Sequence, residues 1–227
     1  MYSKFGQFID GKWSPSENNE TYEVINPATE EVLGHASKAT PADVDRALKS
    51  AEKGLQVWKK TPPWQRSNVL RKIADKMREK KDVFAKWMTL ENGKPLAEGI
   101  GETNGAADIF EWNAEETKRI YGQTVESRFE DTRVHVYYQP VGVVAALSPW
   151  NFPLVLAARK ISTALGAGCS VIIKPDTITP GVVMELVDIC RECGVPPGAV
   201  NLLSGDPPSI ASQLIQSDII KKISITG

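Results

Sequence analysis

The chain has 227 residues, 41% of them hydrophobic, and its 27 Lys and Arg against 28 Asp and Glu give a formal net charge of −1. This balance argues against a nucleic-acid partner, and no apolar run approaches the roughly 20 residues of a membrane-spanning helix. No apolar signal segment opens the chain, and three cysteines cannot form a complete set of disulfides. With two histidines far apart, at His35 and His135, we expect neither a metal site nor a Ser-His-Asp triad. The composition therefore predicts a cytoplasmic globular protein without nucleic-acid or membrane partners.

The N-terminal residues predict short strands and turns. Phe8-Ile9 and Lys12-Trp13 flank Asp10-Gly11, a dipeptide that favours a type I′ hairpin turn because both central residues need positive φ. We expect Tyr22–Ile25 and Glu31–Gly34 to form a second strand pair.

Helices are predicted from position 40 onward. In Thr40-Pro41-Ala42-Asp43, Thr can cap a helix, Pro suits its first position, and an acidic residue lies three residues after the cap. Apolar residues then recur at helical spacing as far as Trp58. Further helices are predicted at about 64–80, 83–90 and 96–120.

The second half of the chain alternates between strands and helices. An alternating strand begins at Val134, and Val141–Leu147 is a continuous apolar run typical of a strand that is buried on both faces. The following elements are predicted as helix 154–165, strand 170–174, helix 180–193, strand 200–203, helix 209–216 and strand 222–225. This order predicts an α/β fold: a Rossmann-like parallel sheet with helices on both faces.

The usual nucleotide-binding glycine motifs are missing. Gly99-Ile100-Gly101 and Gly166-Ala167-Gly168 lack the third glycine, and neither lies between a strand and a helix. A dinucleotide bound to this sheet would therefore bind without the ordinary glycine loop. Open α/β sheets place ligands beyond the carboxyl ends of their strands, which here means residues 148–153, 174–180 and 205–208.

The first of these segments holds an amide side chain between two prolines. In Ser148-Pro149-Trp150-Asn151-Phe152-Pro153, a rigidly held Asn151 amide could stabilise a developing oxyanion. The alternative is an ordinary strand-to-helix turn in which Asn151 caps the helix.

The second segment begins with Lys174, at the end of a predicted buried strand. Its ammonium group could donate to ribose hydroxyls or phosphate oxygens, or it could simply extend from the strand end to solvent. The pair Cys190 and Cys193 has the spacing of a redox motif but lies at a predicted helix end, so we interpret both as structural.

Six segments together resemble the aldehyde dehydrogenase superfamily. They are FIDGKW at 8–13, VINPATEEVLG at 24–34, MTLENGKPLAE at 88–98, LSPWNFPL at 147–154, AGCSVIIKP at 167–175 and GVPPGAVNLLSG at 194–205. A seventh segment, EWNAEETKRIYG at 111–122, is similar to the succinate-semialdehyde dehydrogenase branch. Such enzymes oxidise aldehydes to acids with NAD or NADP, so the resemblance implies a small-molecule aldehyde as substrate.

The resemblance also implies roles for individual residues. Asn151 corresponds to the amide of the oxyanion hole, and Lys174 to the lysine that contacts the adenosine ribose. Arg159 matches an arginine that binds the substrate carboxylate in succinate-semialdehyde dehydrogenases, although it could equally be an exposed helix residue. The further cofactor-binding positions that the resemblance implies are Ser148, Pro149, Trp150, Pro175, Asp176, Thr177, Gly205 and Gly227.

Thr177 bears on the preference between NAD and NADP. NAD-preferring relatives often carry Glu where this chain has Thr177, and a neutral hydroxyl does not repel a 2′-phosphate. We therefore expect NADP to be tolerated, although the neighbouring Asp176 carboxylate could oppose it. We also expect Asn151 and Lys174 to face one cleft.

The resemblance implies a domain organisation that is incomplete in this chain. Residues 1–121 and 141–227 are expected to form most of an NAD(P)-binding domain, and residues 122–140 a β arm for oligomerisation into a dimer or tetramer. The family's nucleophilic Cys and general-base Glu lie beyond the matched region, so we expect the chain alone to be inactive. It would be the N-terminal portion of a dehydrogenase or, alternatively, a non-catalytic module that binds a dinucleotide or a partner.

Overall fold

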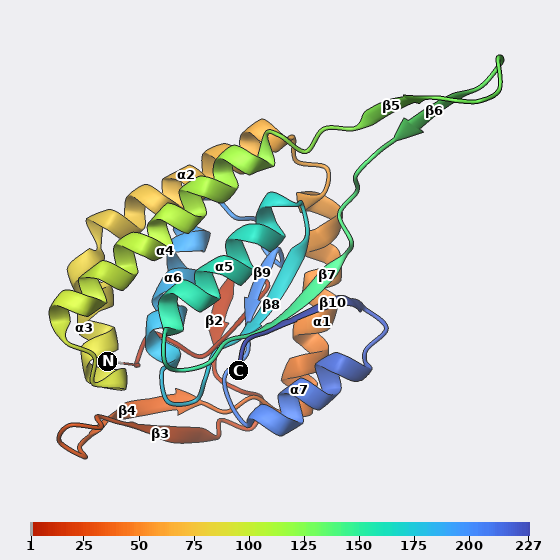
Figure 1. Cartoon of the computed structure of the whole chain (residues 1–227). Coiled ribbons are helices and arrows are strands. Elements are labelled where there is room, and N and C mark those ends of the chain that lie inside the picture. Colours follow the sequence, from red (N-terminus) through yellow and green to blue (C-terminus); the bar gives the residue numbers. More distant parts are fainter. Residues whose placement is uncertain (1) are drawn as a thin grey trace.

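The computed structural model describes residues 2–227, and a six-stranded sheet forms its centre (Figure 1). Its strand order is β10-β7-β8-β9-β1-β2. The first four strands in that order pair in parallel, and β1 and β2 extend the sheet antiparallel. Their bounds are β10 Ile220–Ile225, β7 Val143–Leu147, β8 Ser170–Lys174, β9 Val200–Leu202, β1 Gln7–Ile9 and β2 Lys12–Ser14.

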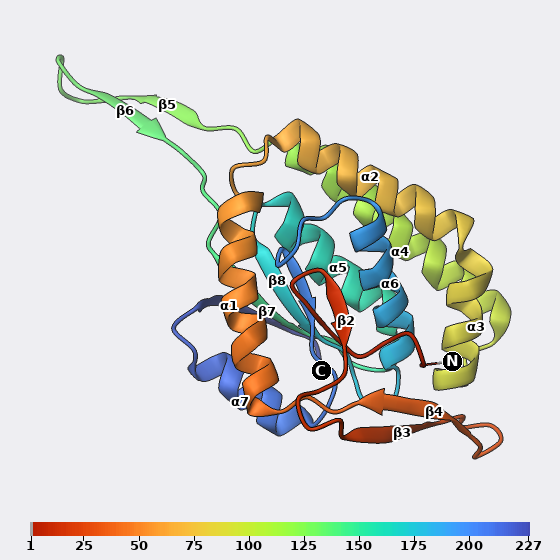
Figure 2. The same cartoon turned by 180° about the vertical axis from the view of Figure 1, so that it is seen from behind.

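Helices cover both faces of the sheet, as the strand–helix alternation predicts (Figures 1 and 2). One face carries α5 (Pro153–Gly166) and α6 (Pro180–Glu192), with α2 (Pro63–Glu79), α3 (Lys81–Asn92) and α4 (Leu96–Thr117) packed outside them. The other face carries α1 (Pro41–Trp58) and α7 (Pro207–Gln216). Each face of the sheet has its own hydrophobic core. Because strand side chains alternate between faces, Val144 and Ala146 of β7 lie in the core under α5 and α6, and Val143 and Ala145 lie in the core under α1 and α7.

The N-terminal hairpin closes the far edge of this sheet. Asp10 and Gly11 have φ of 54° and 77°, as the predicted type I′ turn requires. Phe8 of β1 pairs with Leu202 of β9, so the sheet is mixed rather than wholly parallel. The second predicted pair is also present, as β3 (Thr21–Ile25) and β4 (Val32–Ser37), in a separate two-stranded sheet.

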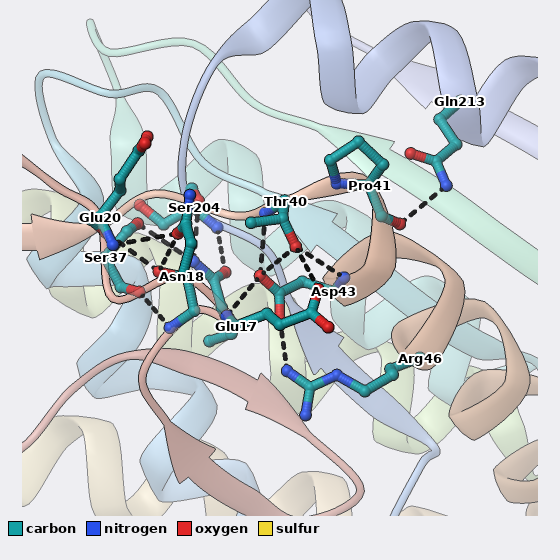
Figure 3. A network of polar contacts seen from close by, with 12 residues as sticks. Glu17, Asn18, Glu20, Ser37, Thr40, Pro41, Asp43, Arg46, Ser204 and Gln213 are labelled. Carbon is teal, nitrogen blue, oxygen red and sulfur yellow. Dashed lines mark hydrogen bonds and ion pairs between the residues drawn. The ribbon is translucent and has the colours of Figure 1, made fainter.

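The start of α1 is fixed by the expected capping box (Figure 3). The Asp43 backbone N–H donates to the Thr40 hydroxyl at 3.2 Å, and the Thr40 N–H donates to the Asp43 carboxylate at 2.8 Å. Burial alone would raise the pKa of Asp43, but hydrogen bonds from Thr40, Arg46 and the Glu17 N–H outweigh it and leave that pKa below its usual value. The buried carboxylate therefore fixes both the helix start and the loop before β3.

A hairpin of β5 (Gln123–Glu126) and β6 (Arg133–Val136) projects from the body in both views (Figures 1 and 2). Its strands are exposed along nearly their whole length, and Phe129 at its tip is exposed as well. None of the helices in residues 2–227 is both long and apolar enough to cross a membrane.

Candidate functional site

The chain reverses its direction across the sheet between β7 and β10. It runs outward from β7 to β8 and β9, then returns through α7 to place β10 on the other side of β7. In open α/β sheets, a ligand crevice forms beyond the carboxyl ends of the strands at such a switch point. The segments beyond the carboxyl ends of these strands begin with Ser148, Pro175, Leu203 and Thr226.

The turn after β7 presents Asn151 at this edge. Asn151 is exposed, and its side-chain amide makes no hydrogen bond within residues 2–227. The helix cap of α5 is Phe152, which contributes no side-chain hydrogen bond, so the alternative in which Asn151 caps the helix is wrong. The amide is therefore free to donate its N–H groups to a ligand.

Lys174 is the last residue of β8 and lies at the same edge of the sheet. Along β8, Val171 and Ile173 join the core under α5 and α6, and Ile172 joins the core under α1 and α7, so the alternation places Lys174 on the α1 and α7 face. Whether Lys174 and Asn151 share a cleft therefore stays a prediction.

The Lys174 side chain does not extend to solvent, because the residue is only 4% exposed. Burial lowers its pKa below the usual lysine value, and the charges of Asp176 and Asp206 oppose that shift. No hydrogen bond within the described part of the chain involves its Nζ. The ammonium group is therefore free to donate to a polar ligand.

The neighbouring positions fit a polar ligand in the same way. The buried hydroxyl of Ser148 has no hydrogen-bond partner among the described residues. Gly205 follows β9 with φ of +143°, and close packing within the chain explains this glycine, since a Cβ there would lie 2.8 Å from the Ala39 nitrogen. Ribose hydroxyls and phosphate oxygens match such free donors. The donor set at this edge therefore fits a nicotinamide dinucleotide.

Carboxylates already bind the N-termini of the three helices that open at this edge. Glu102 accepts from Leu154 and Val155 of α5, Glu91 accepts from α6, and Asp206 accepts from Ser209 of α7. The pyrophosphate of a dinucleotide ordinarily binds at a helix N-terminus. Carboxylates of the protein already accept some of the free N–H groups at these three helix starts.

Glu91 is the most deeply buried of these carboxylates. It accepts hydrogen bonds from the N–H groups of Gly181 and Val182, at 2.7 and 3.1 Å, and from the Tyr2 hydroxyl. Burial raises the pKa of Glu91 to about 7, although all three hydrogen bonds favour the carboxylate. The start of α6 therefore depends on a group that titrates near neutral pH.

This burial predicts a pH-dependent stability. The folded state binds the Glu91 proton up to a pKa of about 7, whereas the unfolded chain releases it near 4.5. The free energy of unfolding should therefore fall as pH rises between these values, by on the order of 2 kcal/mol relative to Glu91→Gln, which cannot titrate. Urea denaturation of both proteins at pH 5 to 8 measures this difference. Parallel pH curves for the two would contradict it.

Arg159 lies partway along α5. It is exposed and lines a cavity of about 250 Å³ together with Val144, Lys160 and Ser224. No hydrogen bond or ion pair with residues 2–227 engages its guanidinium, so it remains available to an anion. The Nζ of the neighbouring Lys160 donates to the Thr226 hydroxyl at 2.7 Å and thereby ties α5 to the end of β10.

Three further residues at this edge, Glu91, Glu102 and Lys160, were not predicted from the sequence. The signal was present for the two glutamates, since each lies at helical spacing among buried residues: Glu91 after Trp87 and Met88, and Glu102 between Gly99 and Ala106. A charged residue on an apolar helix face requires a buried partner. Nothing in the sequence identified that partner as the start of another helix.

The cysteines of the described part of the chain fit a structural role. Burial raises the pKa of Cys190 and of Cys193, which disfavours the reactive thiolate and agrees with a structural role. Within residues 2–227, no cluster of three or more His, Cys, Asp or Glu side chains could hold a metal ion.

Comparison with known proteins gives one consistent match. The model of the aldehyde dehydrogenase family matches residues 13–227. Glutarate-semialdehyde dehydrogenase of Pseudomonas aeruginosa is 40% identical over 97% of this chain and 46% of its own length. The succinate-semialdehyde dehydrogenase [NADP(+)] of Escherichia coli is 39% identical, over 96% and 45%.

Solved structures agree with the sequence matches. The crystal structure of succinate-semialdehyde dehydrogenase from Burkholderia pseudomallei superposes with a TM-score of 0.97 at 37% identity. The alignment covers 98% of this chain and 46% of that one. The chain thus spans about half the length of the relatives that it matches.

Proposed function

Because the chain belongs to the aldehyde dehydrogenase family, we propose that it forms the cofactor-binding portion of an enzyme that oxidises a small carboxylated aldehyde to its acid with NAD or NADP. The observation that carries this proposal is the switch point between β7 and β10, where the free Asn151 amide lies at the carboxyl ends of parallel strands. The relatives are named as glutarate- and succinate-semialdehyde dehydrogenases, and these names support a small carboxylated aldehyde as the substrate.

Each residue of the site has a separate role in this proposal. The nicotinamide cofactor, when bound, supplies the hydride acceptor. Asn151 donates its side-chain N–H to the oxygen that gains negative charge during attack on the aldehyde. Ser148 and Lys174 donate to the cofactor's oxygens, and Pro149, Trp150, Pro175 and Gly205 shape its surroundings. The nucleophile and general base would come from the part of the enzyme beyond the matched region.

The choice between NAD and NADP rests on the segment after β8. Asp176 accepts the Ile178 N–H at 3.0 Å, so this carboxylate is engaged in its own turn. Thr177 is half-buried beside it. A turn-bound carboxylate and a neutral hydroxyl leave room for a 2′-phosphate, and we propose that the enzyme uses either cofactor.

The projecting β5–β6 hairpin is proposed as an oligomerisation arm within residues 122–140. Its exposed Val125, Phe129 and Val134 would be covered by a partner subunit. The remaining residues, 1–121 and 141–227, would form the NAD(P)-binding domain, and Gly227 would lie beside the cofactor. A cytoplasmic location remains part of the same proposal.

Arg159 provides the test of substrate class. In the enzyme that contains this chain, Arg159→Ala should raise the KM for succinate semialdehyde about 10- to 100-fold, because hydrogen bonds to charged groups contribute about 1.5–3 kcal/mol. A neutral aldehyde of similar length should be affected much less. Steady-state kinetics with NAD and with NADP measures both effects.

A matched control is Arg119→Ala, which removes an exposed arginine that is paired with Glu116 on the surface. It should leave both aldehydes unaffected. Equal effects of Arg159→Ala on the charged and the neutral aldehyde would remove the substrate assignment. Cofactor binding without oxidation of any aldehyde would favour the non-catalytic alternative.

A further inference from the structure

One short region, residues 92–102, contacts the middle of the Asn151 turn and the start of α5. Asn92 Nδ2 donates to the Trp150 carbonyl at 3.0 Å. Lys94 Nζ donates to the Asn151 carbonyl, also at 3.0 Å. Glu102 then accepts the N–H groups of the first residues of α5, so contacts follow one another along the turn.

Lys94 is the centre of these contacts. Its ammonium pairs with the Glu102 carboxylate, and the two side chains are only 7% and 2% exposed. The same ammonium lies 4.1 Å from the centroid of the Phe152 ring. The buried Lys94 ammonium therefore contacts three groups: the Asn151 carbonyl, the Phe152 ring and the Glu102 carboxylate.

We infer that Lys94 is a positioning residue that sets the direction of the Asn151 amide, an inference that rests on the proposed oxyanion role of Asn151. The side-chain direction of Asn151 depends on its backbone, and Lys94 fixes the carbonyl of that same residue. Asn92 fixes the carbonyl before it. Two adjacent peptide planes are thus held by side chains from one segment far away in the sequence.

Stability alone is a weak explanation for this arrangement. A buried ion pair often contributes little to folding compared with apolar residues of the same size. Glu102 could bind the start of α5 without a lysine beside it. What the lysine adds is a third contact, to the Asn151 carbonyl, where a displacement of about 1 Å can cost roughly 10²-fold in rate.

The test is a double-mutant cycle in the active enzyme. Lys94→Met should lower kcat about 10- to 100-fold and leave the KM for the aldehyde and the Kd for NADP within about threefold. In an Asn151→Ala background, Lys94→Met should lower kcat no further, because Lys94 acts through that amide. An equal fold decrease in kcat on Lys94→Met with and without the Asn151 amide would overturn the inference, because a general loss of folded protein lowers kcat by the same factor in both backgrounds.

Two further variants keep the result decisive. Lys118→Met is the matched control, because Lys118 also pairs with a glutamate, Glu115, and lies over an aromatic ring, Trp64; kcat should not change. Should Lys94→Met fail to fold, Asn92→Asp places a carboxylate against the Trp150 carbonyl and is expected to lower kcat in the same way, again only when Asn151 is present. An unchanged kcat for Asn92→Asp would then overturn the inference.

A wild-type enzyme that oxidises no aldehyde would refute the proposed function without deciding the positioning role. In that case NMR of this chain decides it. The Asn151 side-chain NH₂ should give one sharp pair of resonances in the wild type, and broadened or multiple pairs in Lys94→Met. Identical spectra would overturn the inference.

Discussion

Replacing Asn151 with alanine should lower the turnover number about 10²- to 10³-fold, the loss expected when one oxyanion-hole donor is removed. The KM for the aldehyde should change far less, because the amide interacts with charge that develops only in the transition state. The structure supports this result on two grounds. The amide is exposed and not engaged by the described protein, and its backbone is fixed by Lys94.

The sharper variant is Asn151→Asp, which keeps the shape of the side chain and removes its donors. It should lose at least as much turnover as alanine, because a carboxylate repels the developing oxyanion. Calorimetric titration with NADP should give an unchanged affinity in both variants and so show an intact cofactor site. A turnover number close to that of the wild type in either variant would contradict the role assigned to Asn151.

Local signals in the sequence predicted most of the helices, strands and turns of the fold. The Asp10-Gly11 turn and the Thr40–Asp43 capping box depend only on residues within a few positions of each other, and both are present. The apolar run at Val141–Leu147 predicted a buried strand, and the structure has that strand at Val143–Leu147. These features are local, because backbone preferences and side-chain periodicity act over short stretches.

Long-range contacts could not be predicted in the same way. Nothing local indicates that β10 returns to the other side of β7, or that β1 closes the sheet beside β9. The link from Lys94 to the Asn151 carbonyl joins two segments that are far apart in sequence. The oxyanion role of Asn151 came from resemblance, since its residues alone fitted a helix cap equally well.

The largest effect on folding is expected at Gly54, near the C-terminal end of α1. Glycine inside a helix costs about 1 kcal/mol relative to alanine, so Gly54→Ala would ordinarily stabilise the protein. Here a Cβ would lie 2.1 Å from the Gly198 carbonyl carbon and 2.3 Å from the Ala199 nitrogen. Both atoms are backbone, so either α1 or the loop that leads into β9 must move.

We therefore expect Gly54→Ala to lower the free energy of unfolding by at least about 3 kcal/mol, since overpacking against fixed backbone is among the most damaging changes. Gly101→Ala in α4 is the matched control, because a Cβ there meets no atom within 4 Å. It should raise stability by about 0.5–1 kcal/mol. Urea denaturation of the three proteins measures both changes, and a Gly54→Ala variant as stable as Gly101→Ala would mean that α1 does not pack against this loop. Because α1 also packs on β8, the strand that ends at Lys174, such a displacement should reach the cofactor edge and weaken NADP binding as well.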